Sequence, residues 1–128
     1  MAPTIVVTAA VIERGGRVLV TRRQRGVHLE GLWEFPGGKR EGRESLAACL
    51  ARELREELDV DAAIGEELFS TTHEYADRRV ELHFLRCELR GEPRPLLGQE
   101  VRWVPRAELA SLKFPAADAE LIRILGAA

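Results

Sequence analysis

The amino-acid sequence predicts an α+β or layered mixed-sheet fold, formed by a single domain that spans residues 1–128. Most apolar runs are short, rich in β-branched residues and bounded by Gly or Pro, as strands are. One stretch, residues 46–58, places its apolar residues at helical spacing. The expected helices are segregated from the strands. A chain of 128 residues has the usual length of one domain.

Turn residues separate the elements of the N-terminal half. Gly15 and Gly16 lie between two β-branched runs, which predicts a hairpin with a glycine-containing loop. Pro36 and the two glycines after it are expected to end a short third strand. Ser45 has the side chain of a helix N-cap and precedes the amphipathic stretch. The expected elements are strands at residues 5–12, 17–23 and 32–35, a loop at 25–31 and a helix at 46–58.

The C-terminal half is expected to add further strands and two short helices. Val80, Leu82 and Phe84 alternate with other residues, as in a strand that buries one face. Residues 90–95 combine Gly and Pro with charged residues, which indicates a loop. The expected elements are strands at residues 62–74, 80–88 and 101–104 and helices at 107–112 and 118–125.

Composition excludes several classes of partner. The formal net charge is −2, from 19 basic and 21 acidic residues, so we expect neither a nucleic-acid polymer nor an anionic membrane as partner. The first apolar run, residues 5–12, is too short to span a bilayer. Cys49 and Cys87 are too few for a disulfide framework. We therefore expect a cytoplasmic protein, and either a monomer or a homodimer.

The helix at residues 46–58 carries three carboxylates beside its apolar face. Glu56 and Glu57 lie three and four residues after Glu53, so the three side chains share one arc of the helix, where they repel one another. One interpretation is a solvated face on which Arg52 pairs with Glu56. The other is a site for Mg²⁺, which prefers oxygen ligands and is commonly held by a few carboxylates and by substrate phosphates. Periodicity alone does not decide between the two.

The residues around this helix resemble the Nudix box, whose pattern is G-x5-E-x7-R-E-U-x-E-E-x-G-U, with U an aliphatic residue. The segment from Gly38 to Val60 matches every specified position except that of Asp59, where the pattern has Gly. That Gly follows the helix, where a left-handed backbone conformation is common. Because Asp tolerates this conformation better than most residues, we expect a modest loss of stability and intact metal ligands.

The resemblance implies the Nudix fold, a mixed β-sheet sandwiched between α-helices (α/β/α), and hydrolysis of a nucleoside diphosphate linked to another moiety. In the family pattern, three carboxylates and one carbonyl hold Mg²⁺, with Mn²⁺ as an alternative, and an Arg–Glu pair fixes the loop to the helix. The first of the three glutamates is our first choice for the general base, and an acid on a later loop is the alternative. These roles fall to Glu53, Glu56, Glu57 and the Gly38 carbonyl as ligands, to Arg52 and Glu44 as the pair, and to Glu53 or Glu100 as the base.

Within the family, the segment from Leu32 to Lys39 resembles the MutT-type branch, which hydrolyses nucleoside triphosphates to the monophosphate and pyrophosphate. The resemblance implies that a set of residues before, within and after this segment contacts the nucleotide. That set is Arg23, His28, Glu34, Phe35, Pro36, Gly37 and Arg78. Without the resemblance, Arg23 could be a charge on an edge strand, Arg78 an ordinary turn residue and Phe35 a core residue.

Asp118 leaves the choice of nucleobase open. The Phe-Pro motif at residues 114–115 resembles that of mutation-avoidance MutT enzymes, in which the residue matching Asp118 is an Asn that reads oxidised guanine. An ionised Asp only accepts hydrogen bonds, whereas a protonated Asp in a buried site also donates. We expect hydrolysis of 8-oxo-dGTP, with CTP or a modified pyrimidine triphosphate as the alternative. Asp118 could also act as a helix N-cap.

Two further alternatives concern the function as a whole. The broader enzymatic alternative is hydrolysis of ADP-ribose or dinucleoside polyphosphates. The alternative from another class is a catalytically silent Nudix module that senses nucleotides, which loss of a box carboxylate would favour. The sequence keeps every carboxylate of the box.

Overall fold

The long strand β1 (Thr4–Arg14) is the centre of the fold, because three other strands pair with it. It is parallel to one of these strands and antiparallel to the other two, so the sheet is mixed. The computed structural model describes residues 3–22 and 31–127. The other elements are β2 (Arg17–Arg22), β3 (Trp33–Glu34), β4 (Gly37–Lys39), α1 (Leu46–Leu58), β5 (Ala62–Glu74), β6 (Arg79–Leu89), β7 (Glu100–Pro105), the 3₁₀ helices η1 (Arg106–Ser111) and η2 (Ala116–Asp118), and α2 (Ala119–Ala127).

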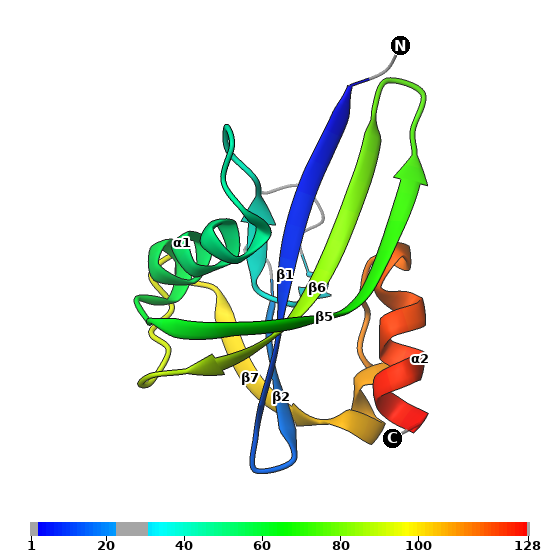
Figure 1. Cartoon of the computed structure of the whole chain (residues 1–128). Coiled ribbons are helices and arrows are strands. Elements are labelled where there is room, and N and C mark those ends of the chain that lie inside the picture. Colours follow the sequence, from blue (N-terminus) through cyan, green and yellow to red (C-terminus); the bar gives the residue numbers. More distant parts are fainter. Residues whose placement is uncertain (1–2, 23–30, 128) are drawn as a thin grey trace.

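The strands of the described chain form one sheet with the order β3-β2-β1-β6-β5, to which β4 adds beside β1 and β7 beside β2. Figure 1 shows how strongly this sheet twists along β1. The middle of β1 lies between β4 and β6, where Thr8 is opposite both Gly38 and His83. The end of β1 pairs with β2 across the predicted hairpin.

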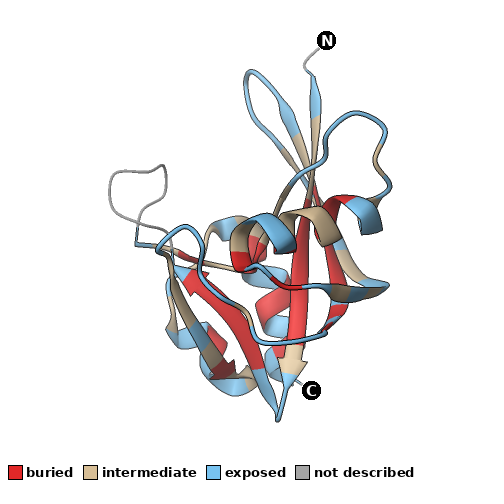
Figure 2. Cartoon of the chain, turned by 90° about the vertical axis from the view of Figure 1, so that its left-hand side faces the viewer, coloured by how far each residue is buried: buried red, intermediate tan, exposed pale blue. Residues whose placement is uncertain are grey.

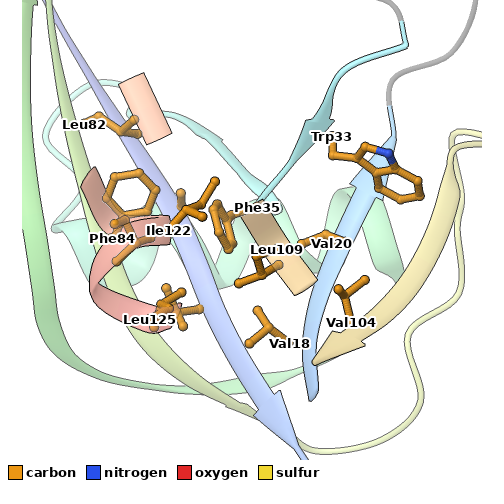
Figure 3. Close-up of a cluster of buried hydrophobic side chains, with 13 residues drawn as sticks. Val18, Val20, Trp33, Phe35, Leu82, Phe84, Val104, Leu109, Ile122 and Leu125 are labelled. Atoms are coloured by element: carbon orange, nitrogen blue, oxygen red, sulfur yellow. The ribbon is translucent and has the colours of Figure 1, made fainter. Parts of the chain in front are cut away.

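Helices cover both faces of the sheet, so the predicted α+β class and its α/β/α layering are confirmed. Alternation along β1 explains the two layers, because neighbouring strand residues face opposite sides. Val11 packs in the cluster on the α2 side, which Figure 3 shows with Phe35, Phe84 and Leu125 among its members. Ile12 packs in the cluster on the α1 side with Leu50, Leu54 and Leu58. Figure 2 shows the buried positions between the layers.

The predicted helix at residues 46–58 is α1 with the same bounds. Ser45 is its N-cap, as expected: the Ser45 hydroxyl accepts a hydrogen bond from the Ala48 N–H at 3.0 Å. The apolar arc faces the sheet, with Leu50, Leu54 and Leu58 fully buried. The helix ends at Asp59, whose φ of 51° and ψ of 45° are left-handed, as the resemblance implied for this position.

One local expectation was wrong. The glycines after Pro36 do not simply stop a strand, because Gly37–Lys39 forms β4 and pairs with β1. The helix expected at 107–112 is present as the 3₁₀ helix η1. A second 3₁₀ turn, η2, precedes α2, which begins at Ala119.

The left-handed conformation of Asp59 leads to a prediction about stability. Gly adopts this conformation without a steric cost, Asp at a small cost and Ala at a larger one. The ion pair of Asp59 with Arg94, at 3.6 Å, is exposed and contributes little. Relative to the wild type, we expect Asp59→Gly to raise and Asp59→Ala to lower the free energy of unfolding by roughly 0.5–1 kcal/mol each. Urea denaturation measures both, and equal stability of the two variants would contradict the prediction.

Candidate active site

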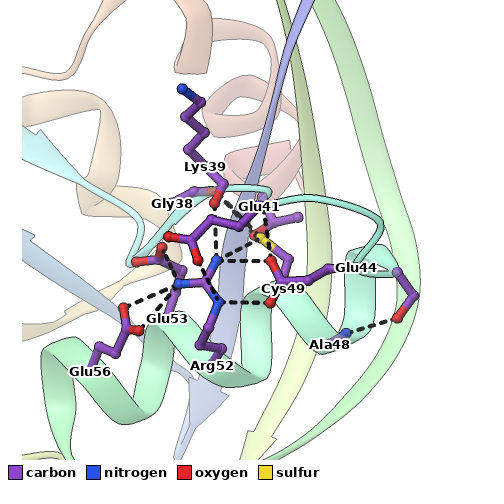
Figure 4. Close-up of polar contacts among 11 residues, drawn as sticks. Gly38, Lys39, Glu41, Glu44, Ala48, Cys49, Arg52, Glu53 and Glu56 are labelled. Atoms are coloured by element: carbon purple, nitrogen blue, oxygen red, sulfur yellow. Dashed lines mark hydrogen bonds and ion pairs between the residues drawn. The ribbon is translucent and has the colours of Figure 1, made fainter.

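Arg52 organises the carboxylates of α1 (Figure 4). Its Nε and Nη2 atoms bond the two carboxylate oxygens of Glu44 at 2.7 and 2.9 Å, so the expected pair is present. Its Nη1 atom donates to Glu53 at 3.0 Å and to Glu56 at 3.1 Å. Nη2 also donates to the Lys39 carbonyl at 3.1 Å, which ties β4 to α1. The hydrogen bonds from Arg52, and one from the Glu41 N–H, lower the pKa of Glu44 to about 2.

The glycine strand β4 lies directly against the carboxylates of α1. A Cβ atom on Gly38 would lie 2.3 Å from the Glu53 carboxyl carbon, so any other residue here would displace this carboxylate from its present position. The Gly37 N–H donates to the Glu57 carboxylate at 3.3 Å. Burial raises the pKa of Glu53, and Arg52 opposes the shift. Two of the three box carboxylates therefore meet the backbone of β4.

The donor set fits a hard cation. Carboxylate and carbonyl oxygens are the ligands that Mg²⁺ prefers. Gly38, whose carbonyl is the fourth expected ligand, has its Cα next to the Glu53 carboxylate. Its carbonyl is contacted by the Thr8 hydroxyl at 3.4 Å and the Cys49 thiol at 3.7 Å. Among residues 3–22 and 31–127, however, no three His, Cys, Asp or Glu side chains are already gathered around one point as metal ligands. Glu53 and Glu56 are bonded to Arg52 instead, so a bound cation would compete with that guanidinium.

A cavity of about 240 Å³ opens on the other side of β4. Several expected nucleotide-binding residues line it, and its walls come from β1, β3, β4, β6 and η2. Phe35 forms an apolar wall, stacked on Phe114 at 5.2 Å between ring centroids. The lining residues that the sequence had indicated are Glu34, Phe35, Gly37, Gly38 and Asp118. The two glycines of β4 thus lie beside the carboxylates of α1 and also line this cavity.

Asp118 is the buried acid of this cavity, with 6 % of its surface exposed. Burial, and then the negative charge of Glu34, raise its pKa from an ordinary 3.8 to about 7. Its carboxyl group makes no hydrogen bond to a backbone N–H among the contacts of the described chain, so an N-cap role has no support here. Asp118 is therefore a group whose proton can be present or absent near neutral pH.

The other expected site residues are placed apart from this arrangement or outside the described residues. Glu100 bonds Arg22 at 2.7 Å and Arg102 at 3.1 Å, and both guanidinium groups lie over the ring of Trp33. Within the described ranges, no contact joins Glu100 to the carboxylates of α1.

Arg78 stacks on Tyr75 at the turn between β5 and β6. Pro36 is buried, and its carbonyl accepts from the Ala10 N–H at 2.7 Å. Arg23 and His28 lie outside the described residues.

Sequence reasoning missed Thr8, which is fully buried and lines the cavity. Its hydroxyl lies 3.4 Å from the Gly38 carbonyl and 3.3 Å from the Cys49 thiol. The one sign of it in the sequence is a hydroxyl within the apolar run at residues 5–12. A larger hollow, of about 640 Å³, lies where β1 and β6 end and β5 begins, and none of the box carboxylates lines it. Its Arg14 and Arg86 are paired with carboxylates, so it offers no free charge of its own to a phosphate.

Comparisons with known proteins identify the family of this chain. A family model described as the NUDIX domain matches residues 7–123. The CTP pyrophosphohydrolase of Escherichia coli (strain K12) is 38 % identical over 118 residues, which cover 91 % of this chain and 86 % of that protein. The putative 8-oxo-dGTP diphosphatase 2 of Mycobacterium tuberculosis (strain H37Rv) is 38 % identical over 132 residues, covering 94 % and 89 %.

Solved structures share the fold over nearly the whole chain. The solution structure of the E. coli ORF135 protein matches with a TM-score of 0.88 and 35 % identity, covering 98 % of this chain and 91 % of that one. The crystal structure of a MutT protein from Methanosarcina mazei matches with a TM-score of 0.85 at 23 % identity, covering 97 % and 94 %. None of the helices in the described ranges is long and apolar enough to cross a membrane.

The raised pKa of Asp118 predicts a pH-dependent cost of keeping this acid buried. The folded protein binds the proton more tightly than the unfolded chain, so stability is lost as pH rises from about 4 through about 7. Asp118→Asn removes this titration. We therefore compare the free energy of unfolding of Asp118→Asn with that of the wild type at each pH. The difference, variant minus wild type, is expected to be roughly 2–3 kcal/mol larger at pH 8 than at pH 5. Urea denaturation at both pH values measures the difference, with the exposed Asp61→Asn as control, and a difference independent of pH would contradict it.

Proposed function

The chain belongs to the Nudix hydrolase family, and on that premise we propose that it is a Mg²⁺-dependent pyrophosphohydrolase acting on nucleoside triphosphates. The products are the nucleoside monophosphate and pyrophosphate. The observation that carries the proposal is the position of β4, whose two glycines face the α1 carboxylates and also line the cavity that holds Asp118. A nucleotide with its base in the cavity would therefore have its phosphates beside the carboxylates.

The protein's part in the reaction follows from the contacts of α1. Glu53, Glu57 and the Gly38 carbonyl, joined by Glu56, would hold the cation. When bound, the cation neutralises phosphate charge and makes a bound water more acidic. Arg52, through its bonds to Glu44 and Glu53, keeps the ligand helix in place against β4. Glu53 is the better candidate for the general base, because it lies against β4 among the proposed ligands, whereas Glu100 pairs with Arg22 and Arg102 apart from them.

We propose 8-oxo-dGTP as the substrate, which makes the function one of nucleotide-pool sanitation and DNA repair in the cytoplasm. An ionised Asp118 can accept hydrogen bonds from the N1–H and N2–H₂ groups of a guanine. The relative from Mycobacterium tuberculosis bears the name of that activity.

CTP is the second candidate, and the pair formed by the buried Asp118 and the half-buried Glu34 favours it specifically. A protonated Asp118 could donate to N3 of cytosine while Glu34 accepts from the exocyclic amine. The pKa of about 7 makes this protonated form abundant near neutral pH. The relative from E. coli named CTP pyrophosphohydrolase supports the same choice.

A panel of nucleotides tests the proposal and the choice of base. With Mg²⁺ present, we expect 8-oxo-dGTP or CTP to be hydrolysed to the monophosphate and pyrophosphate at a higher kcat/KM than dGTP or 5-methyl-dCTP. ADP-ribose, whose hydrolysis is followed by release of AMP, is also expected to be a poorer substrate. Asp118→Asn is expected to change the ratio of kcat/KM between guanine and cytosine substrates by roughly 10-fold, because it replaces an acceptor or donor at the base edge. The exposed Glu120→Gln, two residues away, is the control.

Two outcomes of the panel would contradict these expectations. If no member is turned over, the proposed enzymatic function is wrong for this substrate class. If Asp118→Asn changes all substrates equally, Asp118 does not read the base.

Glu57→Gln tests the assignment of the cation ligands. The substitution keeps the size of the side chain but removes a negative charge, so the cation loses a strong ligand. We expect kcat to fall by roughly 100-fold or more, which corresponds to a few kcal/mol of transition-state stabilisation. The far-ultraviolet circular dichroism and the unfolding midpoint should stay close to those of the wild type. Unchanged turnover at limiting Mg²⁺ would show that Glu57 is not a ligand.

A further inference from the structure

The loop between β6 and β7 lies across the C-terminal end of α1, where Figure 1 draws it in yellow. The last carbonyl groups of an α-helix have no partner within the helix. Here the loop supplies the partners: the Arg94 N–H donates to the Leu58 carbonyl at 2.7 Å, and the Leu96 N–H donates to the Glu57 carbonyl at 3.0 Å. The C-terminal end of α1 is therefore held by backbone N–H donors from a segment more than thirty positions later in the chain.

Gln99 adds a side-chain bond at the same point. Its Nε2 atom donates to the Glu57 carbonyl at 3.1 Å, so this carbonyl accepts two hydrogen bonds from one loop. The Gln99 Oε1 atom accepts from the Leu97 N–H at 2.9 Å, which fixes the shape of the loop itself. The Gln99 amide thus donates to the helix through its NH₂ group and accepts from the loop through its carbonyl oxygen. Neither an ionised Glu nor a Leu, which are of similar size, can do both.

The residue that receives these bonds is one of the proposed cation ligands. The Glu57 carboxylate accepts from the Gly37 N–H of β4, while the Glu57 carbonyl accepts from the loop. Glu57 lies in the last turn of α1, and last turns of helices fray more readily than their interiors. A small rotation of this turn would move the carboxylate away from β4. Glu53 lies one turn earlier and is held by Arg52.

We propose that Gln99 is a positioning residue for the cation site, which fixes the last turn of α1 so that the Glu57 carboxylate stays beside β4. This inference rests on the proposed function, because it takes Glu57 as a cation ligand. Gln99 itself touches neither cation nor substrate. Groups that orient metal ligands in this indirect way typically change metal affinity by roughly 10–100-fold when they are removed.

Two substitutions separate positioning from simple packing. Gln99→Leu has a similar size and loses both hydrogen bonds. Gln99→Glu keeps the acceptor for the Leu97 N–H but places an oxygen opposite the Glu57 carbonyl, so it removes the helix bond alone. The matched control is Arg94→Ala, which removes an exposed ion pair with Asp59 in the same loop and leaves the Arg94 N–H in place.

The measurement is Mg²⁺ binding to the full chain by isothermal titration calorimetry, with the unfolding midpoint recorded for each variant. We expect both Gln99 variants to raise the Mg²⁺ dissociation constant by roughly 10-fold, and Arg94→Ala to leave it unchanged. Half-maximal turnover should shift to higher Mg²⁺ by the same factor, while kcat at saturating Mg²⁺ stays within a few-fold of the wild type.

The possible results are distinguishable. Wild-type Mg²⁺ affinity in both Gln99 variants overturns the positioning role, and so does a loss of affinity that Arg94→Ala shares. If Gln99→Leu fails to fold, Gln99→Glu decides alone. If the wild type itself neither binds Mg²⁺ nor releases pyrophosphate, the proposed function fails first.

Discussion

The close approach of β4 to β1 and α1 is the constraint on which the site depends. A Cβ atom on Gly37 would lie 2.0 Å from the Thr8 carbonyl oxygen, and one on Gly38 would meet the Glu53 carboxylate. The backbone of β1 therefore requires Gly at position 37, and the present position of the Glu53 carboxylate requires it at position 38. Because the strand fits, the backbone of β4 contacts two carboxylates on one side and lines the cavity on the other. A side chain at position 37 would push β4 away from β1, and one at position 38 would displace Glu53.

Much of the fold could be predicted because its signals are local. Ser45 and the apolar spacing after it define α1 to the residue, and β-branched runs locate the long strands. The strand β4 could not be found this way, because Pro36, Gly37 and Gly38 have the composition of a turn. Its pairing depends on Thr8, which is thirty residues away and invisible to a local pattern. The segment at 107–112 has helical composition, yet the chain winds more tightly there and forms η1.

The site shows the same division between local pattern and distant contact. The spacing of Glu53, Glu56 and Glu57, together with the resemblance to the Nudix box, was enough to indicate the carboxylate edge and the pairing of Arg52 with Glu44. The burial of Asp118 beside Glu34 and the bonds from Gln99 to Glu57 arise from chain segments that meet only in the folded protein. Glu100 was an attractive candidate by sequence position, yet Arg22, its partner across two paired strands, holds its carboxylate.

The parallel pairing of β1 with β6 also bears on how the protein is made. Residues 4–12 pair with residues 79–87, so β1 is synthesised more than sixty residues before the strand that becomes its parallel neighbour. Contacts between such distant segments slow folding, and an unpaired apolar strand is prone to aggregation in the meantime. The bond from Gln99 to the Glu57 carbonyl comes from later still in the chain, so the last turn of α1 acquires this support only after residue 99 has been made. The complete site therefore forms after most of the domain has been synthesised, and β1 lacks one of its neighbours until β6 has been made.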